Sequence, residues 1–286
     1  MVMLLSRKRL SLATVLAFLL AICLFCCRPT HETVASEDGV LLPIVMYHGL
    51  HPDTKKQGDY VISPTLFEDD LRFLTQNGYT TVTIEQLIAY TKGGTLPEKP
   101  VLLTFDDGYL NNHLYGTPLL QTYGCQAVLS PIVSETVRYS TLNDRSPAYA
   151  QVTWNDLRTM RDTGCWDIQN HTYALHTYTD RNGSSRLPFE SLEAYATVLQ
   201  ADIGQAQTLL QREVNITPRA FAYPFGAIGK GEREILQDMG FAVTLTCTEQ
   251  HNTVTREAEC LLDMGRFRRR NRMSAREFFT HVVKLP

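Results

Sequence analysis

The sequence predicts an α/β fold in which parallel strands close into a barrel surrounded by helices. Short apolar stretches alternate with helical stretches from residue 41 to the C-terminus, and this alternation is typical of a parallel sheet. About seven such units fill about 245 residues, which suits a closed barrel. Apolar residues make up 44% of the 286 residues, so the chain can bury a large core and is not disordered. We therefore expect one domain at residues 41–286.

The charge of the chain excludes one class of partner. There are 27 Lys and Arg against 30 Asp and Glu, which gives a formal net charge of -3. Binding to nucleic acid requires concentrated positive charge that neutralises phosphates. We therefore expect no nucleic-acid partner.

The N-terminus resembles an export signal. Basic residues 7–9 precede an apolar run from Leu10 to Cys27, and this order is typical of a segment that enters a membrane with its basic end in the cytoplasm. The run is long enough to span a bilayer, so a retained anchor is favoured over a cleaved signal peptide or a lipoprotein signal. We predict a signal anchor or signal peptide at residues 1–28 and a linker at 29–40. The domain is then expected outside the cytoplasm, attached to the membrane at the cell surface.

The cysteines of the domain are widely spaced and include no Cys-x-x-Cys pair. Two disulfides and buried, reduced thiols are both compatible with this spacing, and pairing cannot be derived from it. The four residues concerned are Cys125, Cys165, Cys247 and Cys260.

In the first half of the domain, strands are predicted at residues 41–47, 80–83 and 101–105. A helix is predicted over 63–77, with Ser63 as its N-cap, Pro64 in its first turn and Gly78 after its end. A short helix follows at 84–91.

The second half continues the alternation, as a parallel sheet requires. Helices are expected at 153–163 and 189–212, with a third ending at Met239, and a turn-rich loop at 180–188. Strands are expected at residues 127–133, 166–169, 220–223 and 242–246.

The polar residues that stand out all follow apolar strands. His48 follows 41–47, Asp106 and Asp107 follow 101–105, and His171 and His176 follow 166–169. In a barrel of parallel strands these strand ends meet on one face, where active sites are found. The sequence therefore predicts that these side chains converge.

The adjacent carboxylates of Asp106 and Asp107 can do different work, because neighbouring residues that leave a strand point in different directions. One can bind a cation while the other accepts a proton. The alternative is a solvated acidic turn. The apolar strand before the pair and Gly108 after it, where a tight backbone is expected, argue against this alternative.

Two histidines after one strand, with carboxylates after another, indicate a metal site. Two histidines and one aspartate with open positions form a common hydrolytic site for Zn²⁺ or a similar ion. The spacing of five between His171 and His176 does not fit one face of a helix, so a loop must carry them. We interpret the other isolated histidines as surface residues: His113, His251 and His281.

Two basic features have both a structural and a functional interpretation. Arg219 precedes the strand at 220–223 and is either a surface cation or a charge partner that orients a catalytic carboxylate. The run Arg266–Arg272 is interpreted as a solvated tail, with adhesion to anionic wall polymer or lipid as the alternative.

Three sequence blocks together resemble the polysaccharide deacetylase family, which carries the NodB homology domain. They are Thr-Phe-Asp-Asp-Gly at 104–108, the histidines in 170–176, and Arg-Ala-Phe-Ala-Tyr-Pro-Phe-Gly at 219–226. The blocks occur in the family's order, and the resemblance spans roughly Leu42 to the C-terminus. It implies a distorted (β/α)7 barrel.

The resemblance also implies roles for individual residues. Asp106 resembles the general base, and Arg219 the residue that orients it. Pro224 and Phe225 belong to the block that contacts substrate, where the Phe225 N–H helps to hold the oxyanion. The metal ligands are Asp107, His171 and His176, for Zn²⁺ or alternatively Ni²⁺ or Co²⁺.

The sequence departs from the common pattern of the polysaccharide deacetylase family in two ways, and these departures indicate one branch of the family. The histidines are spaced by five instead of four, and residues 261–267 lack the histidine that usually serves as general acid. Both features are similar to the branch that deacetylates the exopolysaccharide poly-N-acetylglucosamine, in which a Tyr-His pair after the first strand supplies the acid. Tyr47 and His48 match that place, although packing alone can also explain such a pair.

The resemblance thus implies a metal-dependent enzyme that removes N-acetyl groups from an extracellular polysaccharide containing N-acetylglucosamine. We expect it to act as a monomer. Peptidoglycan, chitin oligomers and O-acetylated xylan remain alternative substrates. A non-catalytic glycan-binding protein and an amidase of small molecules are the alternative classes.

Overall fold

The central strand of the fold, β6 (Pro100–Asp107), is buried along its whole length. It hydrogen-bonds in parallel with β2 on one side and β7 on the other. Apolar residues on both faces explain its position, because a central parallel strand is covered on both sides. The main sheet runs in the order β12 (Phe267–Arg268), β2 (Ile44–Tyr47), β6, β7 (Ala127–Pro131) and β8 (Trp166–Ile168), with β5 (Thr80–Thr81) beside the start of β6.

The remaining strands of the described residues form three two-stranded sheets. The parallel pair β9–β10 is connected by single bridges, Asn170–Phe221 and Leu245–Met264, to the chain after β8 and before β12. The predicted α/β fold with parallel strands is confirmed, but the continuous ladders between residues 39 and 285 do not close into a barrel. The pairs are β9 (Ala220–Ala222) with β10 (Val243–Leu245), β1 (Val40–Leu42) with β11 (Asn252–Val254), and β3 (Gly49–Leu50) with β4 (Val61–Ile62).

The predicted helix starts are confirmed where a capping residue marks them. Ser63 Oγ accepts a hydrogen bond from the Leu66 N–H, and Thr153 forms a capping box with Asp156. The α-helices are α2 (Pro64–Gln76), α3 (Ile84–Thr91), α4 (Thr117–Tyr123), α5 (Val133–Thr141), α6 (Trp154–Asp162), α7 (Leu192–Val214), α8 (Glu232–Asp238) and α9 (Ala275–Glu277). Short 3-10 segments are η1 (Thr54–Lys56), η3 (Pro224–Gly226) and η4 (Ala258–Leu261), and π-helical segments are η2 (Asn112–Gly116) and η5 (Phe278–Val282).

Two predicted elements have different bounds. The strand predicted at 41–47 divides at Pro43 into β1 and β2, because proline has no N–H to donate to a ladder. The helix predicted at 189–212 begins after the N-cap Ser191 and continues to Val214, where Asn215 takes a left-handed conformation.

This computed structural model describes residues 39–142 and 144–285. The predicted signal segment at 1–28 and residues 29–38 of the linker lie outside the described residues. All described residues belong to one unit, Thr33–Pro286. None of the helices in this described part is both long and apolar enough to cross a membrane.

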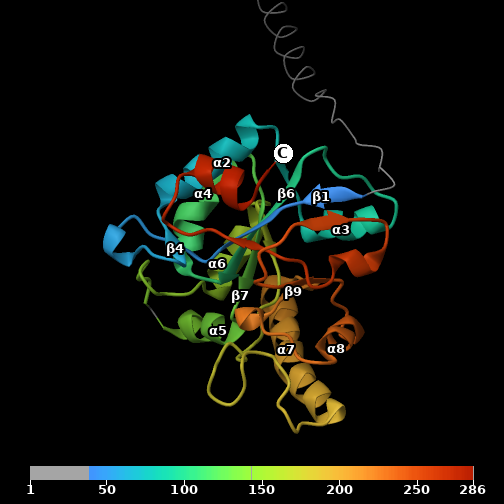
Figure 1. The fold of residues 1–286 in the computed structure, drawn as a ribbon. Coiled ribbons are helices and arrows are strands. Elements are labelled where there is room, and N and C mark those ends of the chain that lie inside the picture. The colour runs from blue at the N-terminus through green and yellow to red at the C-terminus, as the bar shows by residue number, and fades with distance from the viewer. Residues whose placement is uncertain (1–38, 143, 286) are drawn as a thin grey trace, which may run out of the picture. The chain divides into compact units, whose positions relative to one another are not determined.

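Two apolar cores lie on opposite faces of the strands. Inward-facing side chains of β2, β6, β7, β9 and β10 meet in one cluster together with α3. The other faces of β2, β6 and β7 pack against α2, α4, α6 and α7. Figure 1 shows this arrangement, with the strands in the middle and helices around them. The strand ends are thereby fixed from both sides.

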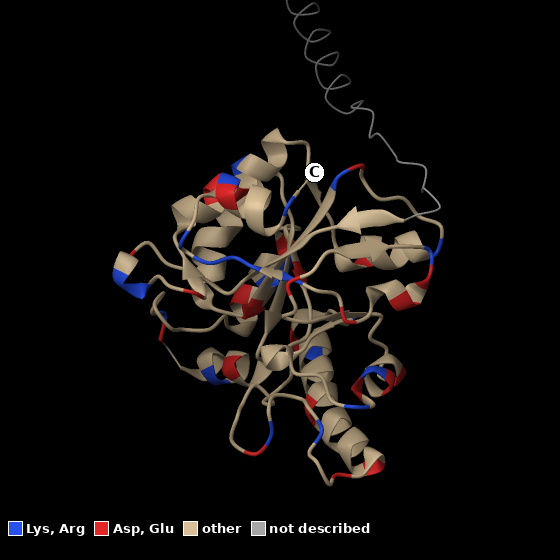
Figure 2. Cartoon of the chain, viewed as in Figure 1, with Lys and Arg blue, Asp and Glu red and all other residues tan. Residues whose placement is uncertain are grey.

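The run Arg266–Arg272 is not the solvated tail that the sequence suggested. Arg266 and Arg269 lie on opposite faces of the extended chain around β12 and are both among the largest fully buried side chains, because the fold packs against both faces. In Figure 2 the basic segment crosses the middle of the molecule, whereas charges of both signs are interspersed over the helices. Arg269 forms two hydrogen bonds to the Asp70 carboxylate, at 2.8 and 2.9 Å, and Tyr47 Oη donates a third at 3.1 Å.

The four cysteines of the domain are all free thiols. Cys125 and Cys165 are buried, which confirms the reduced interpretation for these two.

The buried pair of Asp70 and Arg269 generates a prediction about stability. Asp70→Ala leaves an uncompensated buried guanidinium and should lower the free energy of unfolding by about 3–5 kcal/mol. Burial raises the pKa of Asp70 to about 6, so urea unfolding should be measured at pH 8, where the carboxylate is ionised. The control is the neighbouring, exposed Asp69, whose replacement by alanine should change stability by at most about 0.5 kcal/mol. Equal effects of the two substitutions would contradict the structural role of the pair.

Candidate active site

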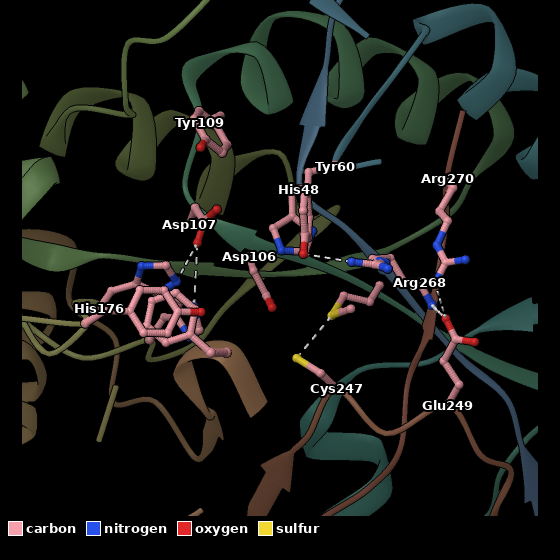
Figure 3. Close-up of a pocket in the computed structure, with 14 residues that line it drawn as sticks. His48, Tyr60, Asp106, Asp107, Tyr109, His176, Cys247, Glu249, Arg268 and Arg270 are labelled. Carbon is pink, nitrogen blue, oxygen red and sulfur yellow. Dashed lines mark hydrogen bonds and ion pairs between the residues drawn. The ribbon is translucent and has the colours of Figure 1, made fainter. Parts of the chain in front are cut away.

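A pocket of about 580 Å³ lies at the carboxyl ends of the strands. Figure 3 shows that Asp107 and His176 lie at one end, Arg268, Arg270 and Glu249 at the other, and Asp106 and His48 between them. The residues that the sequence placed after different strands thus converge, as predicted. The complete lining is Met46, His48, Tyr60, Asp106, Asp107, Tyr109, His171, His176, Tyr178, Phe225, Cys247, Glu249, Arg268 and Arg270.

Asp107, His171 and His176 form a compact set of metal-ligating groups. Asp107 Oδ1 lies 3.6 Å from His171 Nε2 and 3.5 Å from His176 Nε2, and one ligand atom from each residue lies within 4.8 Å of the others. Two atoms that are each about 2.1 Å from one tetrahedral zinc ion are about 3.4 Å apart, so the observed spacing fits such an ion. The spacing of five works because the histidines lie on the irregular chain after β8 and not on a helix.

Two further observations support a cation at this position. Asp107 Oδ1 is buried and has no hydrogen-bond partner among the described residues, although a buried carboxylate oxygen is normally satisfied. The Ala222 carbonyl, 2.7 Å from His171 Nδ1, can only accept, so Nδ1 must carry the proton. In the neutral imidazole, His171 Nε2 then carries the lone pair that a metal ion can accept, 3.6 Å from Asp107 Oδ1, and the carbonyl serves as the outer partner that metal-bound histidines commonly have. The donor set fits a divalent metal ion.

Unusual backbone conformations orient the residues of the metal-ligating set and of the neighbouring turn. Asp107, Thr172 and Phe225 all have positive φ angles, of 69°, 72° and 58°, and each lies where the chain leaves a strand. Such conformations are unfavourable for residues with a side chain and are often found at functional sites. Gly108 also has a positive φ, and a Cβ there would lie 2.7 Å from Pro131 Cβ, so only glycine fits after the carboxylates.

Asp106 is held by a buried arginine. Arg266 Nη1 and Nη2 donate to the two carboxylate oxygens at 2.8 and 2.7 Å, in the paired geometry that a guanidinium forms with a carboxylate. Arg266 is itself fixed by the Thr246 carbonyl and the Thr104 hydroxyl. Burial opposes ionisation of Asp106, but the Arg266 charge outweighs it and holds the pKa of this carboxyl below its ordinary value. The Asp106 carboxylate is therefore ionised and held in one orientation.

The prediction that Arg219 orients Asp106 is wrong. Arg219 precedes β9, at the opposite end of that strand from the pocket, and its Nε donates to the Gly240 carbonyl. Sequence reasoning missed Arg266 because one residue in a run of arginines carries no sign of burial. Its position just before β12 decides the role, and β12 pairs with β2 only in the folded chain.

His48 faces the pocket beside the carboxylates. Its Nδ1 is buried without a hydrogen-bond partner in the described part of the chain, and its ring makes an edge contact with Tyr60 at 4.9 Å. Burial lowers the pKa of His48, while the charges of Asp106 and Asp107 oppose that effect. The three histidines interpreted as surface residues, at 113, 251 and 281, do not line the pocket.

Aromatic side chains form part of the rim. Phe225 lies 4.3 Å from the His176 ring and stacks on Tyr178 at 3.8 Å, whereas Pro224 is buried and does not line the pocket. Burial, with a contribution from Asp107, raises the pKa of Tyr109 to about 12, so its hydroxyl keeps its proton at neutral pH. The sequence indicated aromatic surface but not which residues provide it.

Comparison with known proteins finds relatives described as polysaccharide N-deacetylases. The chain is 24% identical over 225 residues to poly-beta-1,6-N-acetyl-D-glucosamine N-deacetylase of Escherichia coli K12, covering 71% of this chain and 33% of that protein. The enzyme of the same description from Staphylococcus epidermidis is 24% identical over 221 residues, covering 76% of this chain and 71% of that protein. The chain thus spans about a third of the length of the Escherichia coli relative.

Solved structures share the fold. Streptococcus pyogenes deacetylase PplD in complex with acetate has a TM-score of 0.69 at 22% identity, covering 85% of this chain and 99% of that one. A de-N-acetylase from Aggregatibacter actinomycetemcomitans also has a TM-score of 0.69, at 26% identity, covering 82% of this chain and 97% of that one.

The polysaccharide deacetylase profile matches residues 93–244, which include Asp106, Asp107, His171 and His176. Because this match spans more than half of the 286 residues, the chain belongs to the polysaccharide deacetylase family.

Proposed function

We propose that this protein is a metal-dependent N-deacetylase of a polysaccharide that contains N-acetylglucosamine. The observation that carries the proposal is one pocket that holds an Asp-His-His ligand set beside an arginine-bound carboxylate and His48, whose buried Nδ1 has no hydrogen-bond partner among the described residues. The relatives described as poly-beta-1,6-N-acetyl-D-glucosamine N-deacetylases support the choice of substrate. The strands and their connecting bridges also support the distorted (β/α)7 barrel as the description of the fold.

The chain's own residues divide the reaction between them. Asp106, ionised and fixed by Arg266, takes a proton from the water that attacks the acetamide carbonyl. His48 donates a proton to the departing amine, so that acetate and a free amino sugar leave. Asp107, His171 and His176 would hold the metal, for which Zn²⁺ fits the donors best and Ni²⁺ or Co²⁺ are alternatives. When bound, the ion supplies Lewis-acid polarisation and lowers the pKa of water.

Phe225 contributes its backbone N–H to the oxyanion, and the aromatic rim contacts the sugar. Pro224 does not contact the substrate itself but shapes the turn Pro224–Gly226 that presents the Phe225 N–H. We further propose that residues 1–28 anchor the domain at the outer face of the membrane, and that the enzyme works as a monomer on an external polymer.

Metal content and turnover should separate the two neighbouring aspartates. Asp107→Asn and the double substitution His171→Ala with His176→Ala should lose both bound metal and acetate release. Asp106→Asn should keep its metal but lose nearly all turnover, because it removes the base and not a ligand. Metal analysis and acetate release from N-acetylglucosamine oligomers, with and without chelator, test this. Full metal retention by the double histidine variant would refute the ligand assignment.

Arg266 and Arg219 form a matched pair for testing which arginine holds the base. Arg266→Met removes the charge that lowers the pKa of Asp106, so the pKa should rise and the acid limb of the pH dependence of kcat/KM should move to higher pH. Arg219→Met removes a similar side chain outside the pocket and should leave this limb unchanged. A shift in the Arg219 variant instead of the Arg266 variant would reverse our assignment. Circular dichroism should show that both variants are folded.

His48 should matter most when the leaving group needs a proton. His48→Ala should lose about 10²–10⁴-fold in turnover of N-acetyl substrates, which is the usual contribution of a general acid. Hydrolysis of an O-acetyl ester should suffer much less, because its leaving group departs more easily. Tyr60→Phe provides a neighbouring control that keeps the ring contact of His48. Deacetylation of N-acetylglucosamine oligomers within a few-fold of the unmodified enzyme would mean that His48 only packs.

A further inference from the structure

The arginine run around β12 presents alternate side chains to two different places. Phe267 and Arg269 are buried among the helices, whereas Arg268 and Arg270 line the pocket and remain partly exposed. Arg266, two residues before Arg268, holds Asp106. Side chains alternate along an extended chain, so one face of this segment leads from the base toward the end of the pocket away from the metal ligands.

The charges at that end are not balanced. Glu249 is the acidic residue of this wall, and it pairs with Arg270 at a distance of 3.6 Å. In the part of the chain that the structure describes, no carboxylate lies within ion-pair distance of the Arg268 guanidinium. Arg270 Nε is buried and lacks a hydrogen-bond partner among the same residues. This wall therefore has one cation in excess and an unused donor.

Arg268 is held in place without being neutralised. Its Nη1 donates to Tyr60 Oη at 2.7 Å, and its guanidinium lies 4.9 Å from the centre of the Tyr60 ring. Tyr60 in turn contacts His48. An arginine fixed by a neutral partner keeps its full charge. Among the described residues, none hydrogen-bonds to the other edge of the Arg268 guanidinium, which can therefore bind a bidentate ligand.

We propose that Arg268 and Arg270 form a second subsite, which binds an anionic substituent on the glycan whose acetamide reacts at Asp106. This inference rests on the proposed deacetylase function and narrows its substrate to acidic glycans. The group recognised is a carboxylate or a phosphate, since both present the paired oxygens that arginines bind. The position of the subsite places the anion on a part of the glycan beyond His48, away from the metal ligands.

The test compares oligomers that carry an anionic substituent with one that carries an uncharged substituent. We would use an N-acetylglucosamine pentamer with O-succinyl groups, the same pentamer with phosphate monoesters, and one with uncharged O-butanoyl groups as the control for size. The measured quantity is kcat/KM for acetate release, expressed as the ratio of each acidic oligomer to the O-butanoyl oligomer. At least one ratio should exceed about 10 and should fall as salt rises, because exposed charges are screened.

Variants connect this ratio to the two arginines. The double substitution Arg268→Gln with Arg270→Gln should reduce the ratio at least tenfold, mainly through KM. Arg272→Gln is the matched control, since Arg272 belongs to the same run but is exposed, pairs with Asp59 and does not line the pocket. Its ratio should equal that of the unmodified enzyme.

The outcomes separate this inference from others. A high ratio for the succinylated or the phosphorylated oligomer alone supports the subsite and identifies its anion. A ratio near one in the unmodified enzyme, or an unchanged ratio in the double variant, overturns it. If the double variant loses turnover on every oligomer alike, the arginines only position Tyr60 and His48, and the proposal is again wrong.

Binding without turnover distinguishes failure of the subsite from failure of the deacetylase function. Calorimetry with the same three oligomers reports affinity even if no acetate is released. Tighter binding of an acidic oligomer that disappears in the double variant supports the subsite by itself. Equal affinities for all three oligomers overturn it, whether or not the protein is a deacetylase.

Discussion

The buried ion pair between Arg266 and Asp106 connects the fold to the site. Arg266 comes from the chain just before β12 and Asp106 from the end of β6, strands that both pair with β2. Neither charge is tolerable in the interior alone, because desolvating an unpaired ion costs several kcal/mol. The two segments are therefore held in one arrangement, which leaves Asp106 ionised in the lining of the pocket. The orientation of Asp106 and the docking of the C-terminal segment depend on the same two hydrogen bonds.

The other functional residues of the pocket lie in strained turns at the strand ends around this ion pair. Positive φ angles at Asp107, Thr172 and Phe225 turn the chain sharply after β6, β8 and β9. Each turn follows a buried strand: β6 and β9 contribute to one apolar cluster, and β8 contributes to the other. Such strain persists only where the surroundings over-determine the conformation. The rigid core thus allows two separate segments, the end of β6 and the chain after β8, to keep Asp107, His171 and His176 within a few ångströms of one another.

The basic segment around β12 serves several purposes through simple alternation. Arg266 binds Asp106, Arg269 neutralises Asp70 in the helical layer, and Arg268 and Arg270 face the pocket. Adjacent residues of an extended chain point to opposite faces, so one run of similar side chains reaches both the core and the site. Arginine suits all of these positions because its planar group binds carboxylates in pairs and keeps its charge when buried.

Much of this protein was determined by local sequence. Alternating apolar and helical stretches predicted the parallel α/β fold, caps at Ser63 and Thr153 fixed helix starts, and strand-end positions predicted that Asp106, Asp107, His171, His176 and His48 would meet. The tertiary structure alone decided which arginine binds Asp106, since Arg219 and Arg266 each come directly before a strand and only Arg266 reaches the carboxylate in the folded chain. It also decided which arginines are buried. Periodicity and capping act between near neighbours, whereas this ion pair joins residues 160 positions apart, and no local pattern records such a contact.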